Sequence, residues 1–477
     1  MDLNKYKYFL LLFAITFIGF ILRFYNLGTP SLWLDEASTV TFATAGSFWD
    51  ILNLTITTEP NPPLFNWIEY IMITLFGNNE FVLRFIPALV SVLTIPVVYF
   101  IGKEFIDEKG GLIAAVTFSI SPFLILYAQE ARPYSLMFFF LALTLLFYLR
   151  TTEDTKYWIL FAIAGSLAFY THYYSIIFIG ALLLFTLFMY KFKYIKGLIT
   201  SSVILGLTII PLAIISIPVI LQSKSAGATF GYQGISIIYE TFIQLTGFNI
   251  LVAGIMLLLF SYGIYMLYKE DKNRSIFLLW MLASSFIVTF FLSYKIPIVP
   301  RYLIFLELII VLGIAYSYKL LEYLTKNKNS FYIIMLIMVF FSAPILVLST
   351  SQKDDWRGFS NSLSSITQTG DSVIVVPNYI VQPLNYYYSN ATDGTLLYGA
   401  SNASTLQSLK TNNSYYIMTL DIKSADPSGK SYEWIYNNTH LVYAKDSIYL
   451  FKSDYILNTM NAHNIVRENF YGINRSY

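Results

Sequence analysis

A series of long apolar runs constrains this chain more than any other feature of its sequence. About eleven runs are long enough to cross roughly 30 Å of hydrocarbon as helices. Hydrophobic residues make up 56% of the 477 residues and charged residues only 12%, whereas soluble domains carry roughly 25% charged residues. The sequence therefore predicts a polytopic α-helical membrane protein. The runs cover residues 8–22, 81–102, 111–128, 134–149, 157–171, 174–190, 198–220, 249–268, 276–293, 302–318 and 331–349.

The topology depends on residues 63–76, a shorter apolar stretch that carries Asn66 and Glu69. If this stretch spanned the membrane, every later loop would change sides. If it instead lies along the surface, as an interfacial helix in a first outer loop of residues 23–80, the basic loops all share the side of the N-terminal lysines. The positive-inside rule then predicts a cytoplasmic N-terminus and an outer C-terminus. The basic residues that decide this are Lys103, Lys109, Arg150, Lys156, Lys191, Lys193, Lys196, Lys269, Lys272, Arg274, Lys319, Lys326 and Lys328.

The composition changes after residue 349. Asn, Ser, Thr, Tyr and Asp dominate residues 350–477, and apolar runs shorten to strand length, as in 372–377 and 447–452. The sequence predicts a transmembrane domain over 1–349 and a soluble extracytoplasmic α/β domain over 350–477. It contains no cysteine, so a disulfide framework and a thiolate metal site are excluded. We expect membrane lipids as partners and no nucleic acid.

Several basic residues contradict the charge bias, because this topology places them at outer helix ends or in outer loops. Any one of them could reach lipid phosphates from a helix end, but as a set they fit an anion site better. Arg132 and Arg301 each neighbour a proline that can start an inward-running helix, and a helix N-terminus favours phosphate. Lys224 lies in a long outer loop, 222–248, that could cover the site. The full set is Arg23, Arg84, Arg132, Lys224, Lys295 and Arg301.

Two adjacent carboxylates, Asp35 and Glu36, follow the first apolar run. An ordinary explanation is a surface helix with Asp35 as N-cap and Glu36 in the first turn. The basic residues favour a catalytic role for the two carboxylates. Moving a sugar from a lipid-linked phosphate to an alcohol requires a base for the acceptor hydroxyl and positive charge for the departing phosphate. Asp35 could be the base, while Arg132, Arg301 or a divalent ion stabilises the phosphate, and a single displacement inverts the anomeric carbon.

Three further ionisable residues are candidates. Glu130 could orient Arg132, bind sugar hydroxyls or, with Asp35, hold a divalent metal such as Mg²⁺ or Mn²⁺, which this chemistry does not require. A simple surface ion pair would also explain it. His172 lies among aromatic residues at the outer end of a run, where a backbone-bonded belt histidine is the simpler interpretation and substrate binding the alternative. Glu307 falls inside a run, where a carboxylate is costly unless it faces a polar cavity.

The order of eight short motifs resembles the GT-C membrane glycosyltransferases, in particular the family 39-like group with protein O-mannosyltransferases and aminoarabinose transferases of lipid A. The motifs are Leu22-Arg23, Tyr25-Asn26-Leu27-Gly28, Leu32-Trp33-Leu34-Asp35-Glu36-Ala37, Asn61-Pro62-Pro63-Leu64, residues 127–135 (YAQEARPYS), Thr171-His172-Tyr173, Pro300-Arg301-Tyr302 and Asp355-Trp356-Arg357-Gly358. The likeness covers essentially the whole chain. The Trp-Trp-Asp signature of oligosaccharyltransferase catalytic subunits is absent from the sequence, which disfavours transfer of a whole glycan to asparagine.

The resemblance implies a GT-C fold and a polyprenyl-phosphate sugar donor, of the dolichyl-phosphate type, used at the outer membrane face. It places Asp35 and Glu36 at the centre of the site and Arg301, next to Tyr302, at the donor phosphate. The acceptor would carry its hydroxyl on a protein, a glycan or a lipid. Members of the group differ in divalent metal use.

A transporter or flippase for a lipid-linked or anionic solute is the alternative from another class, since it would also need cations among many spans. Transporters place their key polar groups near the bilayer midplane on broken helices, often with repeat symmetry. The charges of this sequence cluster at one edge instead. A receptor or adhesion module is a weaker alternative, because one helix would anchor it.

Overall fold

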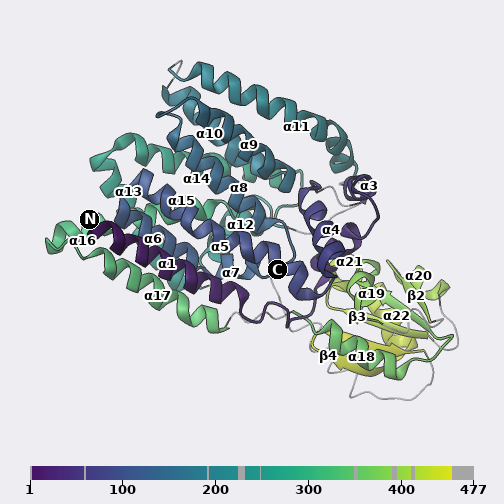
Figure 1. The fold of residues 1–477 in the computed structure, drawn as a ribbon. Helices are drawn as coiled ribbons and strands as arrows, with labels where there is room; N and C mark the ends of the chain where they lie inside the picture. Colours follow the sequence, from purple (N-terminus) through teal and green to yellow (C-terminus); the bar gives the residue numbers. More distant parts are fainter. Residues whose placement is uncertain are drawn as a thin grey trace. The chain divides into compact units, whose positions relative to one another are not determined.

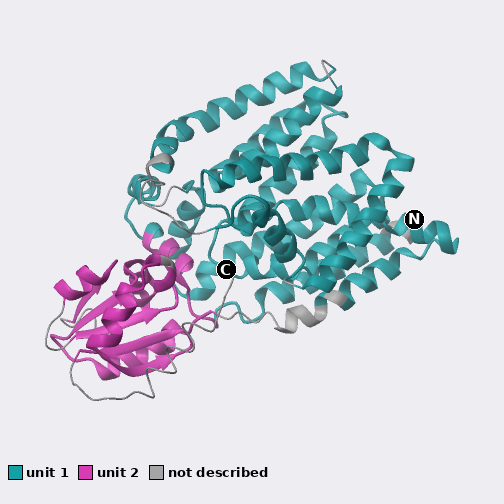
Figure 2. Ribbon diagram, turned by 180° about the vertical axis from the view of Figure 1, so that it is seen from behind, with its two compact units in different colours: residues 1–28, 42–351 teal, residues 29–41, 352–477 magenta. Residues whose placement is uncertain are grey.

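The computed structural model describes residues 3–58, 61–190, 193–223, 231–247, 249–348, 353–388, 395–409 and 414–453. The chain divides into a first unit of residues 1–28 and 42–351 and a second unit of residues 29–41 and 352–477 (Figure 2). The sequence placed one boundary after residue 349. The structure adds residues 29–41, from the predicted first outer loop, to the C-terminal unit.

Helices build the described part of the first unit (Figure 1). One helix, α2, begins in residues of the second unit and ends in the first. The helices are α1 (Leu3–Phe24), α2 (Leu34–Ala43), α3 (Phe48–Thr58), α4 (Leu64–Phe76), α5 (Glu80–Phe105), α6 (Glu108–Ser119), α7 (Pro122–Ala128), α8 (Tyr134–Arg150), α9 (Lys156–Thr171), α10 (Ser175–Tyr190), α11 (Ile195–Ser223), α12 (Ile235–Leu245), α13 (Ile250–Glu270), α14 (Lys272–Ser293), the 3₁₀ helix η2 (Pro300–Leu303), α15 (Leu306–Tyr316), α16 (Tyr318–Thr325) and α17 (Phe331–Leu348).

Helices cover the apolar runs that the sequence marks as spans. Among the described residues, six helices are long and apolar enough to cross a membrane, or seven if the bent pair α6–α7 is one span. The chain is therefore a multi-pass membrane protein, and the count of about eleven spans stays a prediction. The six are α1, α5, α11, α13, α14 and the segment Leu306–Thr325.

The first unit has a buried centre and an apolar outer ring. Every residue of α15 and the stretch 110–119 of α6 are buried. By contrast, α1 and α11 expose large apolar side chains, with Phe9 66% and Leu207 74% exposed. A helix that is apolar on all sides is stable either inside a core or against lipid, so the outer helices of this unit suit a bilayer.

A buried arginine supports a break between two helices. Helices α6 and α7 meet at 59°, and such a break leaves carbonyl groups at the end of α6 without helical partners. The Arg23 guanidinium donates to the carbonyl oxygens of Ser119 (2.8 Å) and Phe118 (3.2 Å), and its Nε donates to the Ser91 hydroxyl (2.7 Å). Glu307 acts electrostatically on Arg23. Arg23 therefore holds the helix break instead of joining the predicted outer anion site, and Glu307 contributes a buried negative charge in its surroundings.

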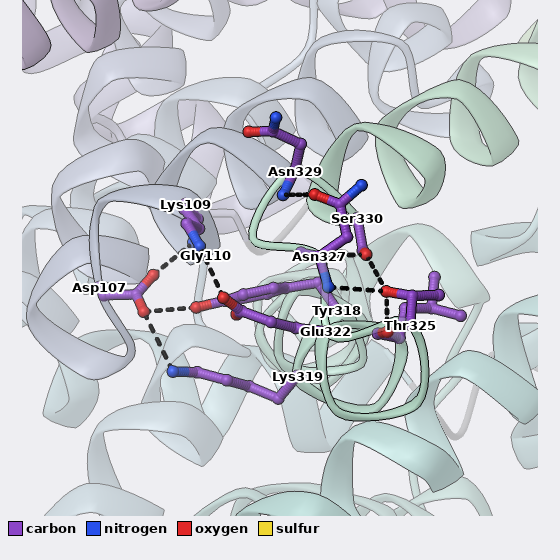
Figure 3. Close-up of polar contacts among 11 residues, drawn as sticks. Asp107, Lys109, Gly110, Tyr318, Lys319, Glu322, Thr325, Asn327, Asn329 and Ser330 are labelled. Carbon is purple, nitrogen blue, oxygen red and sulfur yellow. Dashed lines mark hydrogen bonds and ion pairs between the residues drawn. The ribbon is translucent and has the colours of Figure 1, made fainter.

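A second polar cluster joins the start of α6 to α16 (Figure 3). Asp107 accepts a hydrogen bond from the Tyr318 hydroxyl and pairs with Lys319 at 3.4 Å, while Lys109 pairs with Glu322 at 3.1 Å. Although burial opposes it, hydrogen bonds to its carboxylate and the charge of Lys319 hold the pKa of Asp107 below its ordinary value. The cluster joins two loops that the positive-inside rule assigns to the same side of the membrane.

Glu69 is a buried carboxylate on α4, the predicted interfacial helix. Its side chain is fully buried, and neither carboxylate oxygen has a hydrogen-bond partner among the described residues. Burial raises the pKa of Glu69 well above its ordinary value. A buried polar group without a partner costs stability, so Glu69 weakens the fold at neutral pH.

We expect the Glu69→Gln variant to be more thermostable than the wild type at pH 8, with a smaller difference at pH 5. The unfolded chain releases the Glu69 proton near the ordinary pKa, whereas the folded chain keeps it. At a pH above this ordinary pKa, folding takes up a proton. The free energy of unfolding therefore falls by about 1.4 kcal/mol per pH unit until Glu69 also ionises in the folded protein. Thermal unfolding of purified protein at both pH values measures this, with the exposed Glu153→Gln as control. The same gain at pH 5 and pH 8 would contradict the assignment.

The second unit contains a five-stranded sheet in its described residues, in the order β2-β1-β3-β5-β4. β1 pairs in parallel with β2 and β3, and β5 pairs antiparallel with β3 and β4. The strands are β1 (Ser372–Val376), β2 (Leu396–Gly399), β3 (Ser414–Thr419), β4 (His440–Lys445) and β5 (Ile448–Lys452). The helices are α18 (Trp356–Ile366), η3 (Asn378–Ile380), α19 (Val381–Tyr387), α20 (Ala403–Ser408), α21 (Ile422–Ala425) and α22 (Lys430–Asn438).

Both faces of this sheet are buried. Alternate residues of β1 point to opposite faces: Val373 and Val375 pack in one cluster with α18 and α19, whereas Ile374 and Val376 pack in the other with α20 and α22. This explains the continuous apolar runs of β1 and β5, since strands covered on both sides need no polar alternation. The α/β character predicted for this region is present.

Candidate functional site

An arginine surrounded by aromatic rings lies where several helix ends of the first unit meet. Arg301, in η2, donates a hydrogen bond from Nε to the Tyr134 hydroxyl at 2.9 Å, at the start of α8. Its guanidinium carbon lies 5.9 Å from the centroid of the Tyr134 ring and 5.8 Å from that of Tyr302. Cation–π contacts of this kind orient a guanidinium without neutralising its charge. Tyr134 and Tyr302 therefore hold the Arg301 guanidinium in a fixed direction.

The rings around Arg301 contact one another. We call Arg301, Tyr134, His172, Tyr174 and Tyr302 the Arg301 cluster. The Tyr302 ring lies 5.0 Å from those of both His172 and Tyr174, and the Tyr134 ring lies 5.8 Å from His172. The Tyr174 hydroxyl donates to the carbonyl just before η2, that of Pro297, at 2.9 Å. The turn between α9 and α10 is thus tied to the segment that carries Arg301.

His172 is buried and neutral within this cluster. Its Nδ1 accepts a hydrogen bond from the Tyr174 backbone N–H at 3.4 Å, so the ring proton lies on Nε2. Burial, together with the charges of Arg132 and Arg301, lowers the pKa of His172 to about 3. The backbone bond expected of a belt histidine is present, and the ring also lies against Tyr302. At neutral pH His172 can donate a hydrogen bond from Nε2 but does not titrate.

The segment with Glu130 and Arg132 forms a tight turn beside the Arg301 cluster. Both side chains are buried, and the Arg132 N–H donates to the Glu130 carbonyl at 2.7 Å. Gln129 anchors the turn, because its amide group donates to carbonyls at the end of α1, including that of Tyr25 at 2.9 Å. The charge of Arg132 acts on His172. The structure therefore brings Arg132 and Arg301 to the same histidine.

Two other predicted cations, Arg84 and Lys295, are described but are not members of the Arg301 cluster. Arg84 is buried and donates to the Leu27 carbonyl at 3.0 Å, which fixes the chain after α1. Lys295 is exposed in the turn after α14. Lys224 lies outside the described residues.

The adjacent carboxylates belong to the second unit and have different surroundings. Helix α2 begins at Leu34, so Asp35 lies inside the first turn and is not the N-cap that the simpler interpretation expected. Glu36 is fully buried and pairs with Lys353 at 3.1 Å, and it also accepts a hydrogen bond from the Trp33 N–H at 3.4 Å. Asp35 is partly exposed. Of the two carboxylates, Asp35 is the more exposed.

The described residues contain no group of three or more His, Asp or Glu side chains placed to hold a metal ion. The predicted pair, Asp35 and Glu130, belongs to different units. We therefore assign no metal ligand, and no chemical step below passes through a metal.

Comparison with known proteins gives both a sequence match and a fold. The family model described as dolichyl-phosphate-mannose-protein mannosyltransferase matches residues 60–221. An uncharacterized protein of Aquifex aeolicus is 31% identical over 161 residues, which cover 32% of this chain and 32% of that protein. The chain thus matches about a third of the length of this relative.

Solved structures match nearly the whole chain at low identity. ArnT from Cupriavidus metallidurans bound to undecaprenyl phosphate is 12% identical, with a TM-score of 0.60 over 95% of this chain and 99% of ArnT. The apo state of the same ArnT gives a TM-score of 0.59 over 94% of this chain and 98% of ArnT. An oligosaccharyltransferase of Archaeoglobus fulgidus, tethered to an acceptor peptide, is 13% identical with a TM-score of 0.56 over 95% of this chain and 75% of that enzyme.

Proposed function

Because this chain has the fold of the GT-C membrane glycosyltransferases, we propose that it is an inverting glycosyltransferase that uses a polyprenyl-phosphate sugar donor. It moves a hexosyl or pentosyl group to an acceptor hydroxyl at the outer membrane face. The observation that carries the proposal is the Arg301 cluster: a fixed guanidinium among tyrosine rings, in a fold shared with a protein solved with undecaprenyl phosphate bound.

The Arg301 cluster supplies the donor half of the reaction. Arg301 binds the phosphate that links the sugar to its lipid, and Arg132 adds a second positive charge. As the bond between the anomeric carbon and the phosphate oxygen breaks, negative charge grows on the leaving phosphate. Preorganised donors aimed at that charge lower the barrier. The Nε2–H of neutral His172 and the Tyr302 ring can bind the phosphate or the sugar, whereas no proton transfer is assigned to His172.

Asp35 supplies the base for the acceptor half of the reaction. Its carboxylate takes the proton of the acceptor hydroxyl as that oxygen attacks the anomeric carbon from the face opposite the phosphate. One bond forms and one breaks, so the product has the inverted configuration. Glu36 is the weaker candidate for the base, because Lys353 already pairs with it in a buried position.

The proposal is tested with purified protein in lipid nanodiscs and a panel of polyprenyl-phosphate sugars. Protein, glycan and lipid acceptors are each supplied. We expect one donor to release polyprenyl phosphate in an acceptor-dependent way, with NMR showing an inverted anomeric centre. A retained anomeric configuration, or no transfer from any donor under conditions in which the protein binds polyprenyl phosphate, would contradict it.

One observation favours a transporter as a second candidate. Transporters use broken helices with polar groups, and the broken pair α6–α7 has the buried Arg23 and Glu307 in its surroundings. However, the Arg23 guanidinium already donates hydrogen bonds to the Ser119 and Phe118 carbonyls at the helix break. Movement of intact lipid-linked sugar across proteoliposomes, without release of polyprenyl phosphate, would favour this candidate.

A further inference from the structure

The segment with Asp35 is held by hydrogen bonds to the start of α18, within the second unit. The Ser31 hydroxyl donates to Asp355 at 3.0 Å and accepts from the Arg357 N–H at 3.2 Å. The Arg357 guanidinium donates to the Thr29 carbonyl at 3.2 Å. Asp355 and Arg357 are two residues of the Asp-Trp-Arg-Gly motif, so that motif binds the chain four to six residues before Asp35.

A second set of contacts comes from α19. The Leu32 N–H donates to the Tyr387 hydroxyl at 2.8 Å, and the Ser38 hydroxyl donates to Gln382. These bonds lie on both sides of Asp35 in the sequence. Leu34, directly before Asp35, packs against the apolar cluster that covers one face of the sheet. The segment is therefore fixed along its length by the C-terminal part of the chain.

The Glu36–Lys353 ion pair fixes the rotation of α2. The Glu36 side chain is 0% exposed and that of Lys353 only 11%. Successive side chains of an α-helix differ in direction by about 100°, so a pinned Glu36 determines where Asp35 points. A buried pair that loses one partner leaves an uncompensated charge, which would release α2 from this orientation.

We propose that Lys353 and Tyr387 are positioning residues for Asp35: the C-terminal unit sets the direction of the base toward the acceptor hydroxyl. This inference rests on the proposed function. It gives Lys353 and Tyr387 a role in the reaction that acts through Asp35. Because Arg301 holds the donor phosphate, loss of positioning lowers kcat and leaves the donor KM unchanged.

The test compares Lys353→Met, Lys353→Arg and Tyr387→Phe, with the exposed Lys430→Met of the same unit as matched control. A base displaced by about 1 Å can cost up to a hundredfold in rate. We expect at least a tenfold fall in kcat for Lys353→Met, about a threefold fall for Tyr387→Phe, substantial rescue in Lys353→Arg, and wild-type values for Lys430→Met. Donor KM should not change in any of them.

A double variant separates positioning from simple stability. Adding Glu36→Gln to Lys353→Met removes the buried charge, so thermostability should recover. Positioning predicts that kcat stays low in the double variant, because the ion pair that orients α2 is still missing. Recovery of kcat together with thermostability would overturn the inference, as would a wild-type kcat in Lys353→Met. If Lys353→Met does not fold, a wild-type kcat in Tyr387→Phe overturns it.

These outcomes are distinct from failure of the proposed function. An inactive wild type, or an active Asp35→Asn variant, would reject the enzyme assignment or the base. An active wild type and an inactive Asp35→Asn, combined with unaffected Lys353 and Tyr387 variants, would reject only the positioning role.

Discussion

The Asp35→Asn variant is expected to lose nearly all sugar transfer while remaining folded and inserted in the membrane. Asparagine has almost the same shape as aspartate but cannot accept the acceptor proton. Positioned general bases contribute roughly 10²- to 10⁴-fold to rate, so kcat should fall by that factor. The measurement is single-turnover transfer at saturating donor and acceptor. Donor affinity should stay at its wild-type value, because the proposal assigns phosphate binding to Arg301 and not to Asp35.

Asp50→Asn is the matched control for this variant. Asp50 is an exposed aspartate of the predicted first outer loop, in the first turn of α3, where it accepts hydrogen bonds from Ser47. Asparagine keeps an acceptor oxygen there, so turnover should not change. Unchanged turnover in Asp35→Asn would remove Asp35 from the mechanism. A selective loss in Glu36→Gln with Asp35→Asn active would transfer the role of base to Glu36.

Much of the fold could be predicted from the sequence, because a membrane leaves a helix few alternatives. A run of apolar residues in lipid must satisfy its backbone hydrogen bonds internally, and helices do cover the predicted runs. The resemblance to GT-C glycosyltransferases is confirmed by the family match and the solved structures. Helix α12 was missed because it lies in a predicted loop and is too short to span a membrane.

The role of Arg23 could not be predicted, since it depends on carbonyl groups 95 and 96 residues away. The cation looked like part of an outer anion site because local charge pattern does not reveal such distant partners. A signal for the break was present in Ser121-Pro122, inside the run 111–128. Proline disfavours the α conformation of the residue before it, so this dipeptide marks a helix boundary.

The candidate site was only partly visible in the sequence. Arg132, Arg301 and His172 were chosen for their charge and predicted depth, and the structure brings them together. Tyr134 and Tyr174 were missed because tyrosine is common in this chain, and only the tertiary structure shows which rings surround Arg301. Lys353 was missed because its partner Glu36 lies 317 residues earlier.

The Arg301→Ala variant is expected to weaken donor binding strongly and acceptor binding little. Hydrogen bonds to charged groups contribute about 1.5–3 kcal/mol, which corresponds to roughly ten- to a hundredfold in donor KM. Arg301→Lys keeps the charge but loses the planar fork that bonds Tyr134 and stacks on Tyr302, so it should fall between wild type and Arg301→Ala. The measurements are donor and acceptor KM, with direct titration of polyprenyl phosphate.

Arg150→Ala is the matched control, because Arg150 is a partly exposed arginine that pairs with Glu104 at 2.7 Å on the predicted cytoplasmic side. It should leave donor KM unchanged. Tyr134→Phe adds a finer test: it removes the hydroxyl that accepts from Arg301 Nε but keeps the ring. If orientation of the guanidinium matters as well as its charge, Tyr134→Phe raises donor KM several-fold without changing acceptor KM. Equal losses of donor and acceptor affinity in Arg301→Ala would instead indicate that Arg301 supports the packing of helix ends and does not bind the phosphate.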